Sequence, residues 1–140
     1  MLNFLKVIYQ LSEIPEEFFY RQILNWFTLP APAETLATRP WTLLTYMFTH
    51  YNIWHLISSC LWLWCFGYIM QDIGGNKKII PVFVYGALGG AIAFMLVYNL
   101  LPSLHAQMSF ANALGASSGV MAVAIAATML SPGYRIFPMI

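Results

Sequence analysis

Three long apolar stretches dominate the pattern of hydrophobic and polar positions along the chain. They cover residues 52–70, 79–101 and 113–130, and the second of them contains no charged residue. A helix that crosses a bilayer needs about 20 mostly apolar residues. The pattern therefore predicts three transmembrane helices, and the expected fold class is an all-α polytopic membrane protein.

The segments around these stretches predict how the chain lies in the membrane. Residues 13–27 mix charges with aromatic residues at helical spacing, which indicates an amphipathic interfacial helix. Residues 28–51 contain three prolines, and Trp41, Tyr46 and Tyr51 follow them; this predicts an external loop at headgroup level. Basic residues fall in 71–78 and in 131–140, so we expect both segments to be cytoplasmic. Residues 28–51 and 102–112 are then extracytoplasmic.

Composition supports this interpretation. The chain is 60% hydrophobic and 8% charged, and its mean hydropathy is +0.68. Its formal net charge is +1, which does not favour a nucleic-acid partner. The cysteines, Cys60 and Cys65, stand five positions apart in the first stretch, so we interpret them as separate apolar thiols. We expect the lipid bilayer as a partner and no metal or cofactor.

Polar residues inside a membrane helix are costly, which makes them functional candidates. His55, Ser58 and Ser59 lie near the outer end of the first stretch, and Ser117 and Ser118 lie near the outer end of the third. Because both helices are predicted to run inward, the two clusters lie at the same depth. They could therefore meet in one cavity.

Two interpretations of the serine pair remain open on pattern alone. Ser117, between Gly115 and Gly119, would lie in the first turn of a helix, where free N–H groups and the helix dipole favour an oxyanion. Alternatively, Gly115, Gly119, Ala122 and Ala126 form a small-residue face for helix packing, and pattern alone favours this. His55 and Ser59, at i and i+4, could both donate to an oxyanion, or His55 could simply bond a nearby carbonyl.

Two segments resemble the rhomboid family of intramembrane serine proteases. They are RPWTLLTYMFTHYNIWHLISSCLWLWCFGYI at 39–69 and GASSGVMA at 115–122. The resemblance implies a six-helix bundle around a water-filled cavity, with transmembrane proteins as substrates. It implies that Ser117 is the nucleophile, that Gly115 and Gly119 support it, and that His50 is the family's loop histidine. Ser118 is the alternative nucleophile, because it forms the family's Ser-Gly pair with Gly119, but Ala116 then stands two residues before it where the family has a glycine. The oxyanion site would comprise His55, Ser59 and Ser118.

The sequence departs from the family pattern at two points. Ser59 stands where the family has an asparagine, and Ser118 follows the nucleophile where a glycine is usual. The base histidine of the family's sixth helix has no counterpart, and we interpret His105 as a surface residue. We therefore expect residues 1–140 to be a partial rhomboid-like domain, an inactive fragment of a protease. The alternatives are a catalytically dead relative that binds transmembrane clients and a small three-helix scaffold. The oligomeric state stays open.

Overall fold

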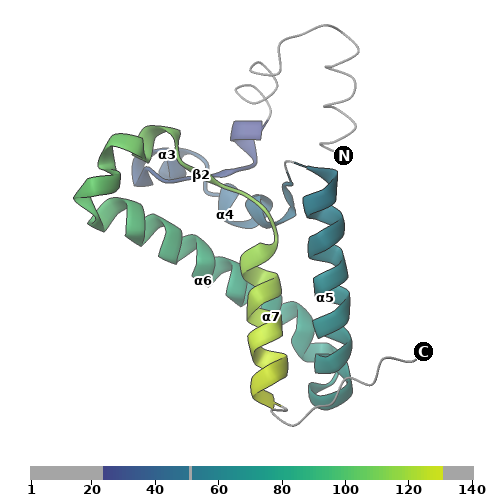
Figure 1. Cartoon of the computed structure of the whole chain (residues 1–140). Coiled ribbons are helices and arrows are strands. Elements are labelled where there is room, and N and C mark those ends of the chain that lie inside the picture. The colour runs from purple at the N-terminus through teal and green to yellow at the C-terminus, as the bar shows by residue number, and fades with distance from the viewer. Residues whose placement is uncertain (1–23, 51, 131–140) are drawn as a thin grey trace, which may run out of the picture.

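A computed structural model describes residues 24–50 and 52–130, and this part of the chain is mostly helical (Figure 1). Its long helices are α5 (Ile53–Gly74), α6 (Ile79–Leu100) and α7 (Ser117–Leu130). The predicted helix at 13–27 and the predicted cytoplasmic segment 131–140 lie largely or wholly outside the described residues. The shorter elements are η1 (Leu24–Trp26), β1 (Leu29–Pro30), α3 (Ala33–Thr38), α4 (Thr42–Thr45), η2 (Tyr46–Phe48), η3 (Asn76–Lys78), η4 (Pro102–Phe110) and β2 (Asn112–Ala113).

Local chemistry sets the ends of α5. Asn52 caps its start, because the side-chain oxygen accepts a hydrogen bond from the Trp54 N–H at 3.0 Å. Gly75 ends it with a φ of +82°, a conformation that glycine adopts without steric cost. Both α5 and the stretch Asn76–Leu100 are long and apolar enough to cross a membrane. The first two predicted transmembrane helices are thus present close to their expected boundaries.

The third predicted span starts later than expected. Residues 112–113 form β2, and α7 begins only at Ser117. At 1.5 Å per residue, the 14 described residues of α7 extend about 21 Å, whereas a hydrocarbon core is about 30 Å thick. The prediction of a helix over 113–130 is therefore wrong at its N-terminal end, because Ala113 pairs with Leu29 in a strand and Gly115 has a positive φ that no α-helix contains.

A short antiparallel ladder joins the first loop to the start of α7. Leu29 pairs with Ala113, and Pro30 pairs with Asn112. The Ala31 N–H also donates to the Ala111 carbonyl at 3.1 Å. The segment 28–51, which we predicted as a plain loop, contains this strand and the short helices α3, α4 and η2. The ladder fixes the position at which the chain enters α7.

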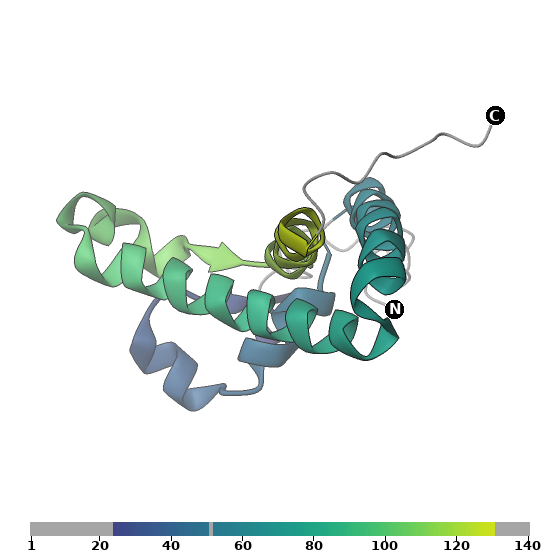
Figure 2. The same ribbon diagram turned by 90° about the horizontal axis from the view of Figure 1, so that it is seen from below.

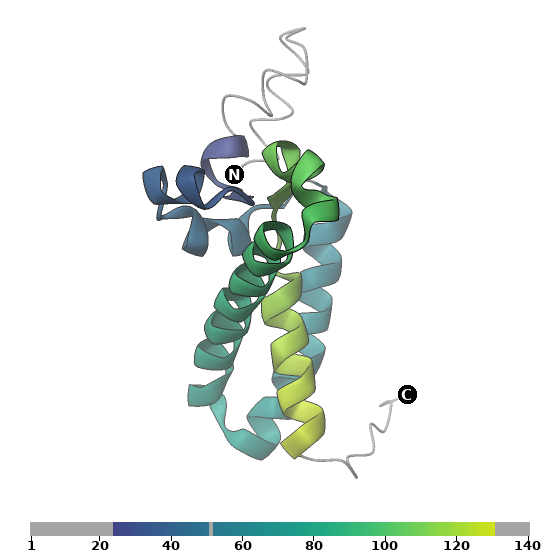
Figure 3. The same ribbon diagram turned by 90° about the vertical axis from the view of Figure 1, so that its left-hand side faces the viewer.

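Helix α7 lies between the other two long helices. It packs along both α5 and α6, whereas α5 and α6 touch each other little beyond their connecting turn. Seen from below, α5 and α7 appear nearly end-on and α6 runs across them (Figure 2). The side view shows α7 in front of α5 and beside α6, with the short elements above them (Figure 3). The start of α7 therefore lies under the folded loop.

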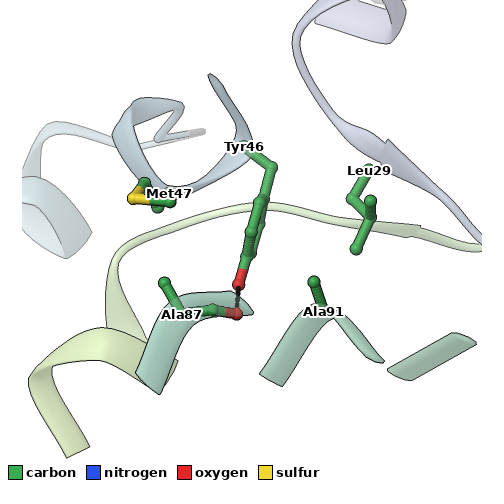
Figure 4. Packing of buried hydrophobic residues seen from close by; sticks show 5 residues of the cluster. All are labelled: Leu29, Tyr46, Met47, Ala87 and Ala91. Atoms are coloured by element: carbon green, nitrogen blue, oxygen red, sulfur yellow. Dashed lines mark hydrogen bonds between the residues drawn. The ribbon is translucent and has the colours of Figure 1, made fainter. Parts of the chain in front are cut away.

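Two buried clusters hold this arrangement together. The upper one joins Leu29, Tyr46 and Met47 of the loop region to Ala87 and Ala91 of α6 (Figure 4). The lower one contains Ile69, Met70, Val123 and Ala127, from α5 and α7.

Close contact between α6 and α7 depends on glycines of α6. A Cβ atom at Gly90 would lie 2.5 Å from the Ser118 Cβ, and one at Gly86 would overlap the Ala122 Cβ. This G-x-x-x-G pair therefore packs against α7 of the same chain.

Candidate active site

The turn before α7 is built around a glycine. Gly115 has a φ of +103°, which disfavours any residue with a Cβ atom. Its N–H donates to the Tyr46 carbonyl at 2.9 Å, so the turn is tied to η2. Helix α7 begins two residues later, at Ser117. The first N–H groups of a helix have no partner within it, so they and the dipole create a site suited to negative charge.

Ser117 lines a cavity of about 380 Å³ between α5 and α7. The His55 ring packs directly against the turn, because a Cβ at Gly115 would lie 3.0 Å from the His55 Cε1 atom. The structure thus brings His55, Ser59 and Ser117 to one cavity, with Ser58 beside them. The other lining residues are apolar: Trp62, Phe66, Val120, Met121 and Ala124.

The two adjacent serines face different helices. Ser117 is exposed and lines the cavity beside α5. The Ser118 side chain packs against Gly90 of α6, and its hydroxyl lies 3.1 Å from the Tyr46 hydroxyl. The Ser118 hydroxyl is therefore directed away from the cavity that His55, Ser59 and Ser117 share.

His50 is buried and hydrogen-bonded to the turn before α7, which the sequence did not indicate. It is 7% exposed, and its Nε2 accepts a hydrogen bond from the Ala116 N–H at 3.3 Å. Its Nδ1 then carries the proton and donates to the Phe48 carbonyl at 3.3 Å. Sequence reasoning placed His50 in the loop as motif support and missed this contact. No local signal could have found it, since the partners lie far apart in the chain.

Burial lowers the pKa of His50 from its ordinary value of 6.5. The hydrogen bond to the Phe48 carbonyl opposes this shift, and the charge of a protonated His55 adds to it. The two imidazole rings are 5.3 Å apart in an edge-on arrangement. The neutral form of His50, which can accept from Ala116, is therefore favoured.

A second cavity, of about 480 Å³, opens between α5 and α6. Ser59 lines this cavity as well as the first, and it is 7% exposed. His50, Cys60 and Ala116 also contribute to the second cavity, whose surface is otherwise apolar. Within residues 24–50 and 52–130, no group of three His, Cys, Asp or Glu side chains could hold a metal ion.

The third histidine, His105, lies apart from the serine. It is exposed on η4, and its Nε2 is 3.2 Å from the Asn99 carbonyl oxygen. This agrees with its interpretation as a surface residue. Among the described residues, no side chain makes a hydrogen bond to the Ser117 hydroxyl. Catalytic hydrogen bonds often tighten only when substrate is bound, so a missing hydrogen bond to the Ser117 hydroxyl is compatible with a role as nucleophile.

These features define a class: a helical membrane protein with a serine at the start of one helix, facing a histidine on another. A family model described as "Rhomboid domain" matches residues 37–138. The chain belongs to the rhomboid family.

Two curated relatives are similar to part of the chain. RHOMBOID-like protein 12, mitochondrial, from Arabidopsis thaliana is 29% identical over 99 residues, which cover 65% of this chain. Rhomboid protease GlpG from Pectobacterium atrosepticum is 22% identical over 69 residues, which cover 49% of this chain. The matches span 30% and 24% of the lengths of these relatives. No solved structure matches the chain.

Proposed function

We propose that these helices are part of an intramembrane serine endopeptidase in which Ser117 is the nucleophile. The observation that carries the proposal is the shared cavity: Ser117 on α7 faces the same space as His55 and Ser59 on α5. Membership of the rhomboid family supports protease-like function at the level of the family. The apolar walls of the cavity suit a substrate segment that comes from the bilayer.

In the proposed reaction the Ser117 Oγ attacks a peptide carbonyl carbon and gives its proton to a general base. The carbonyl oxygen becomes an oxyanion, which the His55 side chain, the Ser59 hydroxyl and the first N–H groups of α7 stabilise. Ser118 contributes through its backbone N–H, because its hydroxyl is engaged with Tyr46. The amine then leaves with the proton from the base, and water hydrolyses the acyl ester.

The general base is the missing element of this mechanism. His50 already accepts from Ala116, and His105 lies beside Asn99. We propose that the base comes from a part of the natural protein outside the described residues. By this reasoning residues 24–50 and 52–130 do not form a complete catalytic site by themselves.

The substrates we propose are transmembrane proteins cut near the extracytoplasmic face. The basic residues of 71–78 support a cytoplasmic position for that turn, and Ser117 lies at the opposite end of α5 and α7. The segments 28–51 and 102–112 would then be extracytoplasmic. The lipid bilayer is the remaining partner, because many large apolar side chains of α5 and α6 are exposed.

Covalent labelling tests this function. The natural protein, purified in mild detergent, is treated with a fluorophosphonate probe, and the labelled peptide is identified by mass spectrometry. We expect the probe on Ser117, and we expect Ser117→Ala to abolish both labelling and cleavage of a transmembrane peptide. Ser103→Ala, on the exposed η4, is the matched control. Cleavage that persists in Ser117→Ala would exclude this serine as the nucleophile.

A second function is a catalytically dead rhomboid that binds transmembrane clients. Ser59 favours it, since a single short hydroxyl stands at the family's asparagine position. The same experiment separates the two functions. A well-folded natural protein that binds a transmembrane peptide without labelling or cleavage supports the binding role.

A further inference from the structure

A chain of hydroxyl groups connects the start of α7 to α6 through the loop. Tyr46 is 3% exposed, and its hydroxyl bonds the Ala87 carbonyl of α6 (Figure 4). A carbonyl oxygen has no hydrogen, so the tyrosine must donate in this bond. The phenol then has no further proton to give. The Ser118 hydroxyl, 3.1 Å away, therefore donates to the Tyr46 oxygen.

Tyr46 also holds the backbone on the other side of Ser117. Its carbonyl accepts from the Gly115 N–H at 2.9 Å, while its hydroxyl accepts from Ser118. One residue of η2 thus contacts the positions two before and one after Ser117. Because the backbone is held at Gly115 and the side chain at Ser118, the first turn of α7 has one orientation.

The surface of α6 provides space for this connection. A Cβ atom at Gly90 would lie 2.5 Å from the Ser118 Cβ and 2.9 Å from its Oγ. A side chain at Gly90 would therefore push Ser118 out of reach of Tyr46. One helical turn away, Gly86 receives Ala122 in the same manner. The glycines set how closely α7 approaches α6. The hydrogen bond between the Ser118 and Tyr46 hydroxyls sets the rotation of α7 about its own axis.

We propose that Tyr46 and Ser118 are positioning residues that hold α7 so that Ser117 faces the cavity beside His55. Neighbouring residues point about 100° apart around an α-helix, because it has 3.6 residues per turn. With Ser118 fixed on α6, Ser117 is directed toward α5. This inference rests on the proposed function for its effect on reactivity, whereas the orientation itself does not depend on catalysis.

The first test measures the fluorophosphonate reaction of Ser117 in the natural protein. We expect Ser118→Ala and Tyr46→Phe each to lower the maximal labelling rate about tenfold, the factor that about 1.4 kcal/mol of activation free energy represents. Probe binding should change less than twofold, because the cavity walls remain. The double variant should be no slower than the single variants, since both remove the same connection.

Controls separate positioning from a general loss of structure. Tyr85→Phe removes an exposed hydroxyl from α6, and Ser103→Ala removes one from η4. Both should label at the rate of the parent protein. Labelling of Ser117 in Ser118→Ala and Tyr46→Phe within twofold of the parent would overturn the proposal.

A second measurement does not require catalysis. Hydrogen–deuterium exchange of a peptide that covers residues 114–121 reports how firmly the turn is held. We expect at least tenfold faster exchange in Tyr46→Phe and Ser118→Ala, with α5 unchanged. If the parent protein does not label at Ser117, the protease function fails, and the exchange rates alone then test whether Tyr46 and Ser118 position α7. Unchanged exchange would rule out this positioning role.

Discussion

The His50 Nε2 accepts a hydrogen bond from the Ala116 N–H at 3.3 Å, across 66 positions of sequence. Ala116 immediately precedes Ser117, so this bond ties the loop before α5 to the residue beside the proposed nucleophile. Together with the Tyr46–Gly115 bond, it leaves the turn held from η2 and from the loop that follows it. The position of Ser117 therefore depends on the loop region as well as on α7.

Replacement of His50 by alanine should destabilise the protein. The Ala116 N–H is buried and would lose its acceptor, which costs about 1–3 kcal/mol. His105→Ala is the matched control, because that ring is exposed and its removal buries no unpaired group. Thermal unfolding in detergent measures the difference. Equal melting temperatures for the two variants would contradict the structural role of His50.

Stability should also depend on pH through His50. Its folded-state pKa is lowered, mainly by burial, from 6.5, so the unfolded chain binds the proton more readily. The contribution of the neutral ring is fully present above pH 6.5 and is lost as the pH falls through the lower folded-state pKa. Protonation also removes the lone pair that accepts from Ala116. We expect the melting temperature to fall between pH 7 and pH 5.

The variant His50→Gln provides the control for this titration. A glutamine carbonyl can accept from Ala116 but does not titrate. The melting temperature of His50→Gln should change less between pH 7 and pH 5 than that of the parent. An identical pH profile in both proteins would show that His50 is not the group responsible for the loss of stability.

The sequence predicted those parts of the fold that depend on local pattern. Hydropathy located α5 and α6, and the G-x-x-x-G spacing of Gly86 and Gly90 is typical of close helix packing, although only the structure identifies α7 as the partner. The pairing of β1 with β2 and the His50–Ala116 bond could not be predicted, because both join distant segments. The directions in which the Ser117 and Ser118 side chains point could not be predicted either, because they depend on which side of α7 packs against α6.

Gly115→Ala should impair both stability and the proposed reaction. At a φ of +103° a Cβ atom costs about 1–3 kcal/mol, and here it would also press on the His55 ring. Gly75→Ala is the matched control, because φ is +82° there but no atom lies within 4 Å of the added carbon. We expect both variants to unfold more easily and only Gly115→Ala to slow Ser117 labelling. A similar labelling rate in both variants would count against a role for the His55 contact.

Gly86→Ala should separate α7 from α6. The added methyl would overlap the Ala122 side chain, and overpacking of this kind typically costs about 1–3 kcal/mol. Gly89→Ala, where nothing lies within 4 Å, should be neutral or stabilising because alanine favours helix. Ala122→Gly should restore part of the stability lost in Gly86→Ala. Thermal unfolding checks all three, and the absence of any rescue would mean that the helices do not meet at this pair.

Ser59→Asn should accelerate the proposed reaction. Ser59 lines the same cavity as Ser117 and occupies the position at which the rhomboid resemblance places an asparagine. An amide offers two N–H donors on a longer arm than a hydroxyl, and one donor to an oxyanion can contribute about 10²–10³ in rate. We therefore expect at least about tenfold faster cleavage of a transmembrane peptide by the natural protein.

Ser58→Asn is the control for this gain. Ser58 also lines the cavity, but its side chain leaves α5 about 100° around the helix from that of Ser59. Ser58→Asn therefore adds the same amide to the cavity from a different position. The rise should appear in the maximal rate, because an oxyanion donor acts mainly on the transition state. A gain in Ser58→Asn as large as in Ser59→Asn would mean that the added polarity, and not the position of Ser59, increases the rate. No change in either variant would place Ser59 outside the oxyanion site.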